Sequence, residues 1–433
     1  MSFRLHHVGS ATAKSARSPA RVVITGIGLV CANGFGREAV WKATRDGVSG
    51  IRRVEEYEDV PPPLKLAACV DIEPEFLHQL KVIRLARLAA DEALFDSRVD
   101  WESIDRERFA CAVSGHMGDV YWGHPGPKST NQFQHHTFNS EQWLPNSACW
   151  DLATRYGLLG PRFSHSTACA SGLIDVVHAA RAIQEGSCDM ALAGSSEVID
   201  PLCAAGFSKM RVLADGSDPA ISCMPFDARR KGFVMGEGAG MFVIERLDHA
   251  LGRGAKVYAE LLAGKMLADA HHVTSLSDST EGIVRLIDDV LRKADLSKRD
   301  IGYINAHGTG TEQNDLLEST GIRQAFGIHA DDLCVSSLKS ILGHLVNASG
   351  TVELALTVLG MRDGFAPPTL SLEKQDPACD LDFVPLVVRS NRFQCAIKIS
   401  LAFGGHLVAA AVRRWNNADS GFAYPEAPVR RAA

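Results

Sequence analysis

The 433-residue sequence predicts an α/β fold built from two duplicated βα halves. Apolar runs of strand length alternate with longer runs of helical periodicity, a pattern typical of buried, mostly parallel sheets. A short motif also recurs: residues 170–175 with Gly186 match residues 348–353 with Gly364, at a constant offset of 178 positions. Residues 238–243 resemble residues 403–408 in the same way. Two related halves packed together explain both repeats.

The first half begins with a β-branched run at residues 21–30 that predicts a buried strand. Its Gly26-x-Gly28 doublet resembles a dinucleotide-binding turn, but Cys31 stands where a third glycine is required and no acidic residue follows a second strand. We therefore set that function aside. The pattern further predicts a loop opening at Gly206 and a tightly packed glycine-rich turn at 232–240, with helices at 38–46, 83–94 and 173–186 and strands at 109–114, 189–198 and 241–246.

The second half repeats the alternation of strands and helices. Helical periodicity and apolar, β-branched runs predict helices at 281–294 and 349–359 and strands at 257–262, 301–305, 333–336, 396–401 and 407–412. We expect the halves to span residues 21–257 and 258–415. Residues 1–20 carry Arg and Lys but no acid and predict a disordered extension, with an organellar transit peptide as the alternative; residues 416–433 predict a loose tail.

Composition excludes several functions. The net charge of −6 argues against binding a phosphate backbone, and no apolar run reaches the roughly 18 residues that span a bilayer. We therefore expect no nucleic-acid partner and no membrane insertion. The eleven cysteines are scattered singly, which favours a reducing compartment and predicts a cytoplasmic protein. His135 and His136, in the polar excursion at 121–138, lack partners at ligand spacing, so we expect no metal site.

Cys169 is the candidate nucleophile. It follows Ser166-Thr167-Ala168 at the first turn of a predicted helix, where unpaired N–H groups and the helix dipole favour a thiolate. Its neighbours Ala170, Ser171 and Gly172 are small and leave room for a substrate. A buried structural cysteine explains this stretch equally well, because free cysteine is among the most buried residue types.

Three further motifs follow the ends of predicted strands. His307 lies on a glycine- and threonine-rich turn, and Glu318 follows this turn in a stretch with helical spacing. Lys339 and His344 precede the second small-residue helix, and Phe403 stands in a strand-to-turn segment. Each residue alone is more often structural than functional. In this order they form a specific set.

Together these motifs resemble the β-ketoacyl-[acyl carrier protein] synthases of the elongating KAS I/II type, within the thiolase superfamily. The resemblance runs from Arg21 to about Arg414, and the motifs that carry it are Thr167-Ala168-Cys169-Ala170-Ser171-Gly172, Asn305-Ala306-His307-Gly308-Thr309-Gly310-Thr311, Lys339-Ser340-Ile341-Leu342-Gly343-His344, Pro225-Phe226-Asp227, residues 232–240 and Phe403-Gly404-Gly405. It implies a thiolase-like fold in an αβαβα layered sandwich. It also implies an acyltransferase that condenses a Cys-bound acyl group with malonyl-[acyl carrier protein], in fatty-acid or type II polyketide synthesis.

The resemblance assigns roles to individual residues. Cys169 holds the acyl group, and its N–H and that of Phe403 form the oxyanion hole. His307 and His344 stabilise the enolate formed by decarboxylation, while Lys339 supports them through an ion pair with Glu318. Further implied features are a gate at Phe403, contacts from Thr309 and Thr311 to the phosphopantetheine arm, a homodimer or a heterodimer with a related subunit, and no cofactor other than the carrier-bound arm.

The sequence departs from the family around the gate. Ala402, His406 and Leu407 replace the usual Gly, Thr and Asn, and Ala402 stiffens a hinge. These changes favour a specialised synthase of secondary metabolism as much as a fatty-acid enzyme. One alternative is a ketosynthase subunit active only with a chain-length-factor-like partner. A non-catalytic partner subunit, a Cys–His hydrolase and a degradative thiolase are further alternatives, which the presence of Cys169 and both histidines disfavours.

Overall fold

The computed structural model describes residues 19–54, 64–72, 79–115, 144, 146–214, 216 and 218–416. Most of the strands expected from the sequence are present within one residue or two of their predicted bounds. The strands of the main sheet are β1 (Val22–Cys31), β2 (Gly34–Phe35), β5 (Phe109–Gly115), β6 (Arg162–Phe163), β7 (Met190–Glu197), β8 (Gly238–Arg246), β9 (Ala259–Ala268), β10 (Ile301–Asn305), β11 (Cys334–Ser336), β14 (Cys395–Ala402) and β15 (His406–Arg414). Two-residue strands form two small sheets: β3 (Arg52–Arg53) with β4 (Leu66–Ala67), and β12 (Phe365–Ala366) with β13 (Arg389–Ser390).

The helices also follow the predicted order. They are α1 (Arg37–Arg45), α2 (Lys81–Ser97), α3 (Ser147–Tyr156), α4 (Ser171–Gln184), α5 (Pro201–Lys209), α6 (Leu247–Gly252), α7 (Glu281–Ala294), α8 (Glu312–Phe326), α9 (Lys339–Leu342) and α10 (Ser349–Asp363). In the part of the chain that the structure describes, none of them is both long and apolar enough to cross a bilayer.

The main sheet is mixed, so the prediction of mostly parallel sheets is wrong. Its order is β11-β10-β14-β15-β9-β1-β8-β7-β5-β6, with β2 paired to β1. The outer pairings are parallel, but the five pairings from β14 through β15, β9, β1 and β8 to β7 are antiparallel. Connection length explains part of this difference. A turn as short as residues 403–405 between β14 and β15 can only join antiparallel strands.

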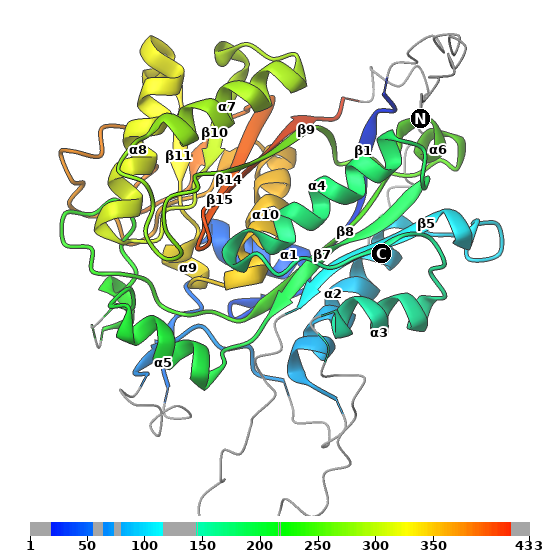
Figure 1. Cartoon of the computed structure of the whole chain (residues 1–433), viewed down its shortest axis with the longest axis horizontal. Helices are drawn as coiled ribbons and strands as arrows, with labels where there is room; N and C mark the ends of the chain where they lie inside the picture. The colour runs from blue at the N-terminus through cyan, green and yellow to red at the C-terminus, as the bar shows by residue number, and fades with distance from the viewer. Residues whose placement is uncertain are drawn as a thin grey trace, which may run out of the picture.

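The elements stack in five layers, as the αβαβα expectation requires (Figure 1). Helices α4 and α10 lie between the strands of the first half and those of the second, and their apolar side chains share one core with both. Helices α2 and α3 cover the outer face of the first half, and α7 and α8 cover the outer face of the second. Both central helices are therefore apolar on nearly every face.

The duplicated motif is visible in the backbone. A 3₁₀ turn at Ala168–Ala170 precedes α4, and its counterpart at Val346–Ala348 precedes α10. Ala168 and Val346 occupy equivalent positions of the repeat and have positive φ values of 47° and 38°. Non-glycine residues rarely adopt such angles, so both turns hold local strain. The two turns meet, because Ser171 Oγ lies 3.1 Å from Asn347 Oδ1.

Helices α3 and α6 were not predicted, α5 replaces a predicted loop, and several predictions fall outside the described residues. The loop expected to open at Gly206 is instead the end of α5. A glycine inside a helix costs about 1 kcal/mol relative to alanine, but here Phe207 packs edge-on against Phe233, with ring centroids 5.4 Å apart. The N-terminal extension to residue 18, the whole polar excursion at 121–138 with His135 and His136, and the tail from residue 417 lie outside the described residues.

The Gly26-x-Gly28 doublet exists because α2 packs directly on β1. A Cβ atom on Gly28 would lie 1.8 Å from the carbonyl oxygen of Ala89. We expect Gly28→Ala to lower the free energy of unfolding by about 3 kcal/mol, since the helix must move away from the strand. Chemical denaturation measures this loss. Gly252→Ala is the control, because no atom lies within 4 Å of its Cβ position, and an unchanged stability in Gly28→Ala contradicts the packing argument.

Candidate functional site

Cys169 lies in the 3₁₀ turn immediately before α4, one turn earlier than the sequence predicts. The residue is 5% exposed, and the strained Ala168 precedes it. Burial raises the pKa of the Cys169 thiol to about 12, although the charge of Lys339 acts in the opposite direction. Desolvation therefore opposes the thiolate that the helix terminus favours. The resting side chain is a neutral thiol that must give up its proton when it reacts.

A pocket of about 160 Å³ joins Cys169 to the other predicted side chains. The Cys169 Sγ atom and ring nitrogens of His307 and His344 all lie within 4.8 Å of one another. The structure therefore brings these three candidate residues together in one pocket. The pocket lining is Cys169, Val212, Phe233, Thr274, Leu276, His307, Thr309, Thr311, Gln313, Asn314, His344, Leu401, Ala402 and Phe403.

The ring of His344 is held by hydrogen bonds to Nδ1. This atom accepts the backbone N–H of Val346 at 3.1 Å and lies 2.9 Å from Ser349 Oγ. Because the Val346 N–H can only donate, Nδ1 is unprotonated and the ring proton resides on Nε2. Burial, with the charges of Lys339 and Lys398, lowers the pKa of His344 well below its usual range. Neutral His344 therefore offers its Nε2–H as a hydrogen-bond donor.

His307 is held through its backbone instead of its ring. Its N–H donates to Glu318 Oε1 at 2.6 Å, and its carbonyl accepts Lys339 Nζ at 2.6 Å. The Nδ1 atom of its ring is buried and, among the described residues, has no hydrogen-bond partner. Burial is the main reason that its pKa lies well below the usual range for histidine. The neutral ring has one nitrogen that donates and one that accepts.

The predicted ion pair between Lys339 and Glu318 is wrong. Lys339 Nζ lies 2.8 Å from Glu353 Oε1 on α10, and Glu318 instead accepts the backbone N–H groups of His307 and Gly308. Glu353 also pairs with Lys398 on β14. The four charged side chains of this network are fully buried: Glu318, Lys339, Glu353 and Lys398. The resemblance had suggested Glu318, whereas the fold places Glu353 within ion-pair distance of Lys339.

Sequence reasoning missed Glu353, Lys398 and the pocket residue Phe233. A signal was present for the two charges, since each interrupts an apolar run of a buried element. Phe233 lies in the glycine-rich turn that the sequence predicted to be packing. Its ring packs edge-on against His344, with centroids 4.8 Å apart, and thereby forms one wall of the pocket.

Thr309, Thr311 and Phe403 line the same pocket. The two threonine hydroxyls lie 2.8 Å apart, and the Phe403 ring stands 6.2 Å from that of Phe207. The hairpin that carries Phe403 is joined to the loop after β9. Gly404 N–H donates to Val273 O at 2.7 Å, and Gly405 O accepts the Asp269 N–H at 3.0 Å. Movement of this hairpin therefore requires movement of the loop.

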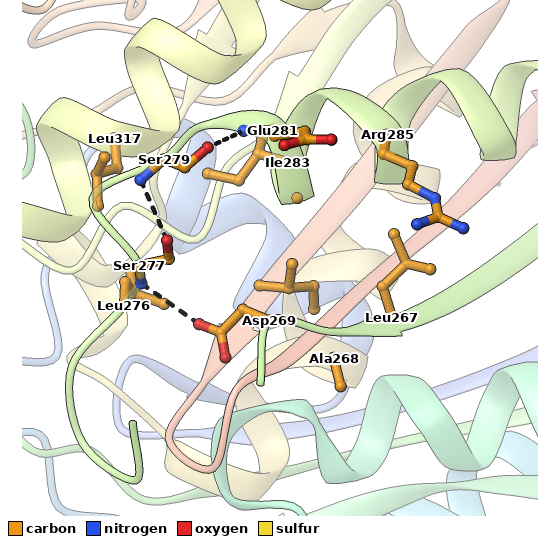
Figure 2. A pocket seen from close by; sticks show the side chains of 12 residues that line it. Leu267, Ala268, Asp269, Leu276, Ser277, Ser279, Glu281, Ile283, Arg285 and Leu317 are labelled. Atoms are coloured by element: carbon orange, nitrogen blue, oxygen red, sulfur yellow. Dashed lines mark hydrogen bonds between the residues drawn. The ribbon is translucent and has the colours of Figure 1, made fainter. Parts of the chain in front are cut away.

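A second cavity, of about 190 Å³, adjoins the first and shares Leu276 with it (Figure 2). Side-chain hydrogen bonds order the loop at its edge. Ser277 N–H donates to Asp269, Ser279 N–H to Ser277 Oγ, and Glu281 N–H to Ser279 Oγ. Leu407 on β15 lines the cavity. These bonds hold in place the loop that presents Thr274 and Leu276 to Cys169.

A third cavity is cationic. It encloses about 450 Å³ and shares Phe233 with the Cys169 pocket. Lys65, Arg211 and Lys231 line it, and Arg211 precedes the pocket residue Val212. Three cations in one cavity favour the binding of an anionic group there.

Comparison with known proteins gives the same family throughout. Residues 20–250 match the model "Beta-ketoacyl synthase, N-terminal domain" and residues 258–373 match "Beta-ketoacyl synthase, C-terminal domain". The chain is 36% identical to 3-oxoacyl-[acyl-carrier-protein] synthase 2 of Coxiella burnetii over 407 residues, covering 89% of this chain and 96% of the relative. It is 34% identical to the tetracenomycin polyketide synthase ketoacyl synthase alpha subunit of Streptomyces glaucescens, covering 91% and 97%.

A solved structure agrees with these relatives. It holds a type II polyketide synthase acyl-carrier protein in complex with its ketosynthase bound to the hexaketide. The TM-score is 0.83 at 30% identity, and the match covers 92% of this chain and 100% of that one. The family models, the relatives and the five-layered fold agree, and the chain belongs to the β-ketoacyl synthase family.

Proposed function

We propose that this chain transfers an acyl group to Cys169 and condenses it, with loss of CO₂, with a malonyl group carried by an acyl carrier protein. The observation that supports this most directly is the enclosed pocket in which one thiol and two neutral imidazoles lie within 4.8 Å of one another. A hydrolase would need only one of the two histidines.

In the first half-reaction Cys169 attacks the incoming thioester. Neutral His344 has no free acceptor nitrogen, because Nδ1 already receives the Val346 N–H. His307 therefore takes the thiol proton and passes it to the departing pantetheine sulfur. The N–H groups of Cys169 and Phe403 stabilise the tetrahedral oxyanion. The products are the Cys169 thioester and the free thiol of the carrier.

In the second half-reaction malonyl thioester loses CO₂. The electron pair of the broken C–C bond passes into an enolate, whose oxygen accepts hydrogen bonds from His344 Nε2–H and a His307 N–H. The enolate carbon then attacks the Cys169 thioester. Collapse of that adduct releases the 3-oxoacyl thioester and the Cys169 thiolate, which takes up a proton from water to restore the thiol. Buried, neutral donors are strong at this step because water does not compete with them.

The substrate arm and its carrier fit the entrance. We propose that the hydroxyls of Thr309 and Thr311 form hydrogen bonds with the amide groups of the phosphopantetheine arm. Phe403 would act as the gate of the pocket. The third cavity, with Lys65, Arg211 and Lys231, would receive the phosphate of the arm or acidic groups of the carrier protein. The chemistry requires no further cofactor.

We also propose how the chain assembles and where it is located. The short edge strand β6 ends the main sheet and leaves a row of backbone groups for a second subunit, identical or related. Since one relative is named as an alpha subunit, activity that depends on a related partner is the second candidate. All eleven cysteines are free thiols, which suits the cytoplasm.

Intact-protein mass spectrometry tests the function. After incubation with a panel of acyl-loaded carrier proteins, we expect one acyl adduct on Cys169, and addition of malonyl-loaded carrier should discharge it as a 3-oxoacyl product. A folded chain that acquires no adduct alone but does so with a related subunit indicates the partner-dependent alternative. Hydrolysis of the acyl carrier without a condensation product contradicts the proposal.

A further inference from the structure

Lys398 is a second buried lysine below the pocket, in addition to Lys339. It lies on β14 and is fully buried. Its Nζ atom donates to the carbonyl oxygen of Ala306 at 3.2 Å and forms an ion pair with Glu353. An ammonium is rarely buried without purpose, because removing it from water is costly even when it is paired.

Three charged side chains hold the turn that carries His307. Lys398 binds the carbonyl of Ala306, and Lys339 binds the next carbonyl, that of His307. On the other side of the chain, Glu318 accepts the successive N–H groups of His307 and Gly308, at 2.6 and 2.7 Å. The two lysines share one carboxylate, Glu353. The position of the turn thus depends on buried charge.

The two histidines are therefore oriented in different ways. Hydrogen bonds to Nδ1 fix the ring of His344, whereas the buried Nδ1 of His307 has no partner in the described part of the chain. The hydrogen bonds of His307 in the described part of the chain are made by its backbone, while its ring packs edge-on against that of His344, with centroids 5.5 Å apart. We propose that Lys398 is a positioning residue for decarboxylation, which holds the turn so that the His307 ring meets the enolate oxygen. This rests on the proposed function and adds to it a residue outside the pocket lining.

The charges around Lys398 give the proposal a pH dependence. Burial, opposed by Glu353, lowers the pKa of Lys398 to about 8, while burial raises that of Glu318 to about 7. The other titratable groups that interact electrostatically with Lys398 or with its partner Glu353 include Lys339 on α9, Cys169, both histidines and Tyr303 on β10. Burial keeps the histidines neutral and raises the pKa values of Cys169 and Tyr303. Above about pH 8, loss of the Lys398 proton leaves one oxygen of Glu353 unpaired and loosens the turn.

Lys398→Met removes the charge and keeps the length of the side chain. We expect it to slow CO₂ release from malonyl-pantetheine by about 100-fold, the cost of misplacing a reacting group by roughly 1 Å. Acylation of Cys169 by hexanoyl-pantetheine, followed by mass spectrometry, should slow as well, by up to about 100-fold, because His307 accepts the thiol proton in that half-reaction. In the wild-type enzyme, CO₂ release should fall above about pH 8, and in Lys398→Met this fall should be absent.

Arg253→Met is a matched control, since it also removes a cation from a buried carboxylate, Glu245, at the far end of β8. It should lower stability without changing the rate of either half-reaction. Unchanged CO₂ release in Lys398→Met, or a fall of its CO₂ release above about pH 8 that matches the wild type, overturns the proposal. Should that variant not fold, a wild-type rate of CO₂ release that stays level from pH 7.5 to about pH 9.5 overturns it as well. If wild-type protein performs neither half-reaction, the proposed function fails instead.

Discussion

Cys169→Ala is expected to abolish acyl transfer and condensation, with a loss of at least about 10⁴-fold in turnover. The pocket holds one thiol, and no other side chain of its lining can carry an acyl group as a thioester. The acyl adduct seen by mass spectrometry should disappear entirely. Alanine fills most of the space of the buried cysteine, so the melting temperature should change by only a few degrees.

Cys188→Ala is the control for this substitution. Cys188 is equally buried but follows the opposite end of α4, about 20 Å along a helix of this length. It should leave the adduct and turnover unchanged. An adduct that persists in Cys169→Ala, or is lost in Cys188→Ala, contradicts the assignment of the nucleophile.

His344→Ala and His307→Ala are expected to separate the two half-reactions. Each removes one donor to the enolate and should slow CO₂ release by about 10²- to 10³-fold. Acylation should differ between them. His344 in its Nε2–H tautomer cannot accept the thiol proton, so His344→Ala should still acylate Cys169 within about threefold of the wild-type rate. His307→Ala should lose about 100-fold in acylation as well.

Rapid-quench measurement of adduct formation, together with release of labelled CO₂, distinguishes the variants. His249→Ala, at a half-exposed site paired with Glu245, controls for loss of an imidazole. If both active-site variants acylate at the same rate, the assignment of the ring proton to His344 Nε2 is wrong. Burial lowers the pKa of both histidines. The rate of CO₂ release by the wild-type protein should therefore show no change caused by histidine titration between pH 6 and pH 8.

Local patterns predicted many of the elements because the spacing of apolar residues along a helix or a strand can be read from neighbouring positions in the chain. The bounds of α7 and β10 follow directly from the spacing of their apolar residues. The helix at α5 was missed because Gly206 resembles a break, whereas a distant partner, Phe233, stabilises Phe207. Strand direction was also missed, since apolar runs look alike whether their neighbours are parallel or antiparallel.

Residue patterns alone pointed to the family-typical motifs, the duplication and the pocket residues Cys169, His307, His344 and Phe403. The charges that support these residues follow from the fold. Lys339 pairs with Glu353 instead of Glu318, and Lys398 completes the network, because α10 and β14 bring together side chains 45 residues apart in the chain. The fold also buries Cys169, which opposes its ionisation. Pairing and desolvation depend on distances through space, which no local pattern of residues specifies.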